Sequence, residues 1–216
     1  MYSGVYALLL ITAQWGYTAA LGEGSVEICA TVYSLGFIFP ALSGAIFWNE
    51  SFGLRSVFGL LMTVLAVIIS GYNTNGEKFK SKYFFPLFLA MAASGGLGII
   101  QKLQQNSPIR DQREMFILFA FLFAGAVSFI FKKNSEYRCS VPIKLKIFSI
   151  GVGICFGCCN VLNTYLAGKL SSAFFFPVQN ISVILVSILL SMLFLSEYPE
   201  KKGLLCWRLA VRQFYC

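Results

Sequence analysis

Few side chains in this sequence could take part in chemistry, and most of the polar ones lie inside long apolar stretches. The candidates are neutral amides and aromatic rings: Gln14, Trp15, Tyr33, Gln101, Asn160, Asn163, Gln179 and Asn180. Such groups bind a solute by hydrogen bonds and ring faces, and none of them is an acid or a base. They predict a binding site for a neutral, zwitterionic or amphipathic solute.

The same residues have a second interpretation, because Asn and Gln side chains also form hydrogen bonds between neighbouring helices in membranes. Solute binding and structural bonding both stay open for each of them. Gln179 and Asn180 favour the binding interpretation because Pro177 lies just before them, and a proline frees a backbone carbonyl and kinks a helix. Pro40 lies in the matching earlier stretch and predicts a second kink.

Enzyme chemistry has little support in this sequence. The chain contains no histidine, which is the commonest general base near neutral pH and the commonest metal ligand. No pair of acids and no nucleophile beside a base lies within the apolar stretches. We therefore expect no catalytic residue, no metal site, no cofactor and no enzymatic activity.

The composition excludes an ordinary water-soluble domain. Hydrophobic residues make up 57% of the chain and charged residues only 12%, and there are 22 phenylalanines. A soluble chain usually has about a quarter charged residues. The net charge of +8 comes from cations placed between the apolar stretches, as expected of loops beside membrane spans and not of a nucleic-acid surface. The expected partners are a small solute and membrane lipids, with a homodimer as a further expectation and no nucleic acid.

Seven windows are long and apolar enough to cross about 30 Å of hydrocarbon. Each should be a helix, because lipid offers no partner to backbone amides and the alternation of a barrel strand is missing. We predict an all-α transmembrane bundle with spans over Tyr2 to Leu21, Val26 to Trp48, Leu54 to Tyr72, Tyr83 to Leu103, Met115 to Phe131, Ile143 to Ala167, and Ala173 to Leu195.

An internal repeat links two of these windows. Phe47-Trp48-Asn49-Glu50 ends one long span and Phe194-Leu195-Ser196-Glu197 ends another, each followed by a short polar turn. Five predicted spans separate the two glutamates, so they lie on opposite faces of the membrane, which is the geometry of an inverted repeat. Both glutamates lie at span ends, which favours capping of free amides or ion pairing over proton transfer.

This pattern resembles the EamA-type repeat of the drug/metabolite transporter superfamily, whose members are similar to two fused five-helix units. The resemblance implies transport of small metabolites or drugs across the cell membrane by alternating access. It divides the chain into the later part of a first unit (1–72), a linker (73–82), a second unit (83–203) and an atypical tail (204–216), so that the chain would cover helices three to nine of ten and a stub of the last.

The tail differs from the rest, because Arg208 and Arg212 interrupt a segment too short to span. This change favours the hypothesis that the chain is an incomplete copy, with a frame shift as one origin. The alternative function is a membrane protein without transport activity, or the product of an inactive gene remnant.

Orientation in the membrane stays open. Ten loop cations follow the third, fifth and seventh predicted spans, and four lie on the other side. The excess of Lys and Arg places the first group in the cytoplasm, whereas the family template implies the reverse.

Overall fold

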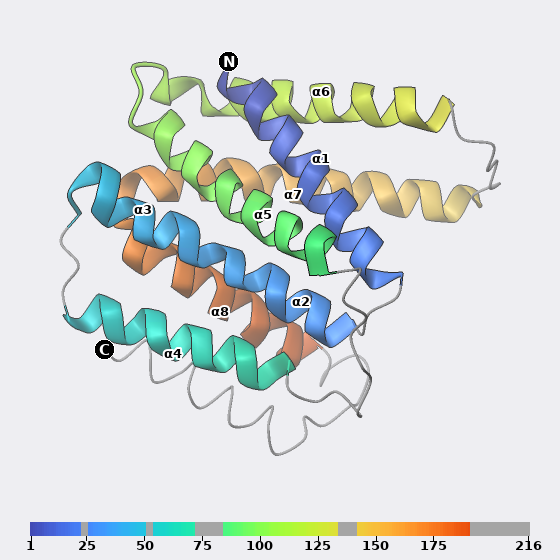
Figure 1. The fold of residues 1–216 in the computed structure, drawn as a ribbon. Coiled ribbons are helices and arrows are strands. Elements are labelled where there is room, and N and C mark those ends of the chain that lie inside the picture. Colours follow the sequence, from blue (N-terminus) through green and yellow to red (C-terminus); the bar gives the residue numbers. More distant parts are fainter. Residues whose placement is uncertain (23–25, 51–53, 72–83, 134–141, 191–216) are drawn as a thin grey trace.

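The computed structural model describes residues 1–22, 26–50, 54–71, 84–133 and 142–190. Within these ranges the chain is helical, with no strand, and the predicted all-α bundle is confirmed (Figure 1). The elements are α1 (Tyr2–Leu21), α2 (Val26–Ser34), η1 (Leu35–Phe37), α3 (Ile38–Trp48), α4 (Leu54–Gly71), α5 (Phe84–Gln105), η3 (Arg110–Gln112), α6 (Arg113–Lys133), α7 (Ile143–Lys169) and α8 (Ser172–Leu190).

Five helices among the described residues are long and apolar enough to cross a membrane. They cover Tyr2–Leu21, Cys29–Trp48, Phe84–Gln105, Arg110–Ile130 and Ile143–Lys169. For α4 and α8, crossing the membrane stays a prediction. The linker 73–82, the tail 204–216 and Glu197 lie outside the described residues, so the second copy of the repeat motif is not seen.

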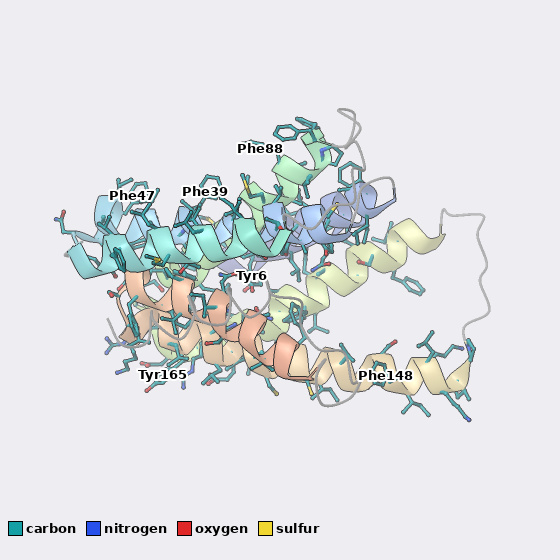
Figure 2. The ribbon with its side chains drawn as sticks, turned by 90° about the horizontal axis from the view of Figure 1, so that it is seen from below. Tyr6, Phe39, Phe47, Phe88, Phe148 and Tyr165 are labelled. Carbon is teal, nitrogen blue, oxygen red and sulfur yellow. The ribbon has the colours of Figure 1, made fainter. Side chains whose placement is uncertain are left out.

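The outer surface of the bundle is apolar. The side chains of Phe47, Phe88 and Phe148 are 72%, 49% and 69% exposed. Figure 2 shows them at the rim of the bundle, whereas Tyr6 lies inside it. Such a surface is unfavourable in water and is well solvated by lipid tails. The exposed rings therefore agree with a bundle whose solvent is the membrane.

Helix α5 lies at the centre of the bundle and packs against α1, α2, α3 and α7. Small residues allow this close approach: a Cβ atom added to Gly95 would lie 2.6 Å from both the Gly36 carbonyl oxygen and the Phe39 ring. Gly95 and Gly98 on α5 therefore permit close helix contacts. Gly153 and Gly157 on α7 differ, because no described atom comes within 4 Å of a Cβ built there.

The predicted span Val26 to Trp48 is not one continuous α-helix. The 3₁₀ helix η1 separates α2 from α3 just before Pro40. Pro40 has no N–H group, so the carbonyl of Gly36 loses its usual partner and the backbone tightens locally. In contrast, α8 continues through Pro177 as a single helix.

A buried ion pair joins α3, α5 and the start of α8. Lys102 Nζ lies 2.6 Å from Glu50 Oε1, and the two side chains are only 6% and 15% exposed. The other carboxylate oxygen, Glu50 Oε2, accepts a hydrogen bond from the backbone N–H of Ser172 at 2.6 Å. Lys102 also donates to the carbonyl of Leu170 at 3.0 Å. The expectation of capping and ion pairing at Glu50 is confirmed, although the capped helix is one that begins 122 residues later.

Gly95→Ala should destabilise the bundle, because the added methyl group overlaps the backbone of η1 and the ring of Phe39. Overpacking of this kind costs about 1–3 kcal/mol. Gly125→Ala is the matched control, since nothing described lies within 4 Å of its Cβ position on α6. Thermal unfolding in detergent should show a lower midpoint for Gly95→Ala alone. Equal midpoints would contradict the close contact between α5 and η1.

Lys102→Met should destabilise the protein by about 3–5 kcal/mol, because it leaves the Glu50 carboxylate buried without a cation. The double variant Glu50→Gln/Lys102→Met should recover part of this loss, since it removes the unpaired charge. Arg110→Gln is the control: Arg110 and Asp111 are 4.0 Å apart and both largely exposed, so their pair contributes less than about 1 kcal/mol. Chemical unfolding in detergent measures all three. If the double variant is less stable than Lys102→Met, the ion pair is not what holds the helices together.

Candidate functional site

The bundle contains a partly open cavity of about 460 Å³. Residues of α1, α2, η1, α3, α5, α7 and α8 line it, so segments far apart in the sequence meet there. Seven of the eight predicted site residues lie on its wall: Gln14, Tyr33, Gln101, Asn160, Asn163, Gln179 and Asn180. Residues from five separate helices thus converge on one space, which the sequence alone did not establish.

Trp15 is the exception and lies outside the cavity. Its side chain is 58% exposed and borders a different pocket, beside Leu89 and Ala124. Trp15 borders this second pocket and not the central cavity, whereas its neighbour Gln14 borders both. The prediction of Trp15 as a site residue is therefore not supported by its position.

A hydrogen-bonded cluster forms one part of the cavity wall. The hydroxyl of Tyr6 donates to Asn160 Oδ1 at 2.7 Å. Gln101 Nε2 donates to the Tyr6 hydroxyl at 3.2 Å and to Asn160 Oδ1 at 3.4 Å. These residues come from α1, α5 and α7. The cluster therefore connects three helices, and for Gln101 and Asn160 the structural interpretation holds.

Tyr6 was missed at the sequence level. Its side chain is 1% exposed and also packs edge to face against Phe116, with ring centroids 5.3 Å apart. Tyrosine occurs often at the ends of membrane spans, so its presence in an apolar stretch gives little signal. The usable signal is that a buried tyrosine hydroxyl needs a hydrogen-bond partner, and amides were available in other spans.

The remaining amides of the cavity differ in how much of their bonding capacity is used. Asn180 donates to the carbonyl of Phe176 on its own helix, at 3.1 Å. The side chains of Gln14, Asn163 and Gln179 form no hydrogen bond with any described residue. A polar group inside a membrane protein is costly unless it finds a partner. These three amides are accordingly the groups best placed to bind a polar solute or water.

Aromatic rings and neutral hydroxyls complete the wall. The rings of Tyr17 and Tyr33 lie 5.0 Å apart at their centroids, and both border the cavity. Phe37 and Phe176 add apolar surface. No Asp, Glu, Lys or Arg is among the described residues of the wall. The cavity therefore offers hydrogen bonds and ring faces to a solute, but no formal charge.

Two successive layers of side chains pack between α3, α5 and α8 on one side of the cavity. In the first layer Gly98 is in contact with Pro40 and Phe176: a Cβ on Gly98 would lie 2.9 Å and 2.8 Å from them. Gly44, Lys102 and Ser172 lie one helical turn further toward the ends of the same three helices, since each is four residues away. This second layer contains the ion pair with Glu50. A charged layer thus lies behind an apolar one.

Lys102 was also not predicted as a candidate residue, although it lies near the end of a predicted span. A charged side chain inside an apolar stretch requires a partner, and Glu50 was the acid at the end of another span. Their pairing depends on the crossing of α3 and α5, which the sequence does not give.

Comparisons with known proteins bear on the fold. No family model and no curated protein matches the sequence. Seventeen solved chains match by structure. One of them, described only as "Crystal structure of protein", is 17% identical, with a TM-score of 0.70 over 98% of this chain and 73% of that chain. At this identity the likeness shows a shared arrangement of helices and nothing about activity.

Proposed function

We propose that this protein is a multi-pass membrane transporter that moves a small neutral solute by alternating access. The observation that supports the proposal best is the neutral polar cavity inside a bundle with an apolar outer surface. A bundle that only had to be stable would fill this space with apolar side chains or satisfy every amide. Here three amides are left without a protein partner among the described residues.

The chemistry of the wall narrows the class of solute. Amides and tyrosine hydroxyls present both donors and acceptors, and the rings of Tyr17, Tyr33 and Phe176 offer flat apolar surface. An ion with a net charge would lose its hydration without meeting an opposite charge on this wall, which carries a large desolvation penalty. A neutral, zwitterionic or amphipathic metabolite with a flat apolar portion fits these properties.

The two packed layers beside the cavity give the proposed transport cycle a physical basis. Alternating access requires a cavity that opens to one side while the other side is sealed. In this proposal the apolar layer of Pro40, Gly98 and Phe176 and the Glu50–Lys102 pair seal one side of the cavity. Opening that side would separate α3 and α8, which pack side by side (Figure 1). It would also break the bonds of Glu50 to Lys102 and to the N-terminus of α8.

The proposal agrees with the resemblance to the EamA-type repeat of the drug/metabolite transporter superfamily, and it places the protein in the cell membrane. The second candidate is a membrane protein of the same fold without transport activity. The observation that argues against this second candidate is the set of cavity amides without a hydrogen-bond partner among the described residues, which a purely structural bundle does not need.

Gln14→Ala and Gln179→Ala should each raise the KM for a transported solute about three- to tenfold, the loss expected for one hydrogen bond. Trp15→Ala is the matched control, because Trp15 is next to Gln14 but outside the cavity. The measurement is uptake of radiolabelled neutral amino acids and nucleosides into proteoliposomes.

Two results would count against the proposal. If the wild-type protein moves none of these solutes faster than empty liposomes, transport of this class is wrong. If it moves one of them and both Gln variants equal the wild type, the transport stands and the site assignment fails.

A further inference from the structure

A second hollow lies between α6 and α7, apart from the central cavity. Its volume is about 660 Å³. The lining is mostly apolar and includes Ile117, Leu118 and Phe121 on α6 and Gly153, Gly157 and Leu162 on α7. None of these residues borders the central cavity. We call this hollow the α6–α7 groove.

The groove has the length of one membrane leaflet. Its lining on α7 extends from Gly153 to Tyr165, which is about 18 Å at 1.5 Å per residue. Half of the hydrocarbon core of a bilayer is about 15 Å thick. An acyl chain anchored at one membrane surface would therefore follow the groove to the midplane.

The glycines of α7 leave the groove open. A Cβ atom added to Gly153 or Gly157 would meet no described atom within 4 Å. Leu118, Ile154 and Leu162 in the lining of the groove are 52%, 63% and 57% exposed. The groove thus faces the surroundings of the bundle and not its interior.

Positive charge gathers at one end of the groove. The guanidinium of Arg113 lies 4.7 Å from the centroid of the Tyr165 ring, and Lys169 Nζ lies 5.8 Å from it. Arg113 begins α6 and Lys169 ends α7, so both lie at the same end of the two helices, and Figure 2 shows Tyr165 there. Glu114 pairs with Arg113 at 3.0 Å, whereas Lys169 has no ion pair with a described residue. Among the described residues, one positive charge is therefore left uncompensated at the mouth.

We propose that the α6–α7 groove binds one glycerophospholipid with an anionic headgroup. Its phosphate lies between Arg113 and Lys169, and an acyl chain follows the apolar wall past Gly157 and Gly153. The charge supports an anionic over a zwitterionic headgroup, because cations near the membrane surface attract anionic lipids. The proposal needs only a membrane location and does not depend on transport.

Native mass spectrometry of the full chain tests this binding. The protein is purified in detergent and equilibrated with equal amounts of phosphatidylglycerol and phosphatidylcholine. We expect one retained phosphatidylglycerol per monomer. Arg113→Gln/Lys169→Gln should reduce this retention roughly tenfold relative to phosphatidylcholine. Arg110→Gln is the control for charge, because Arg110 is exposed and outside the groove.

A second pair of variants tests the apolar wall. Gly157→Phe should fill the groove and abolish retention of the lipid. Gly151→Phe should leave retention unchanged, because position 151 is equally open but outside the groove. The matched pair separates loss of the groove from loss of folding.

Three outcomes would overturn the proposal. The first is equal retention of the two lipids by the wild type, and the second is equal retention by Gly157→Phe and Gly151→Phe. The third is a dimer that Gly157→Phe converts to monomers, which would show a second copy of the chain in the groove.

Discussion

The carboxylate of Glu50 is the point on which the arrangement of the bundle depends. One oxygen pairs with Lys102 on α5, and the other accepts the first backbone N–H of α8. In surroundings of low dielectric constant neither charge is stable alone, so the three helix ends must stay together. Gly44 makes this possible, because a Cβ atom there would lie 2.5 Å from Glu50 Oε2 and 2.6 Å from the Ser172 side chain. The amide of α8 adds the favourable field of a helix N-terminus.

The same contact separates charge from the cavity. Lys102 and Glu50 use their bonding capacity on each other and on the α7–α8 junction, one turn beyond the layer of Pro40, Gly98 and Phe176. What remains inside is neutral: a cluster around Tyr6 that ties helices together, and amides that have no partner in the described part of the protein. The cluster around Tyr6 makes the bonds between helices that the structural interpretation predicts, whereas solute binding by the other amides stays a proposal.

Particular residues show which features of the structure the sequence could predict. The span from Tyr2 to Leu21 is a helix with those same bounds, because lipid forces backbone hydrogen bonds to close within the segment. The break at Leu35–Phe37 was predicted only as a kink at Pro40, since the position of a local 3₁₀ turn depends on the packing of Gly36 against α5. Gln14 and Trp15 were grouped by their chemistry, although only Gln14 borders the central cavity.

The sequence by itself determined the helices, the apolar outer surface and the absence of acids and bases among the polar candidates, because these follow from composition and from backbone bonding in lipid. Only the tertiary structure decided which polar groups share a cavity, that Tyr6 joins Gln101 and Asn160, and that Glu50 meets Lys102. The physical reason is that these contacts join residues 52 to 154 positions apart, and helix rotation and crossing angle set them. Hydropathy along the chain contains no information about either.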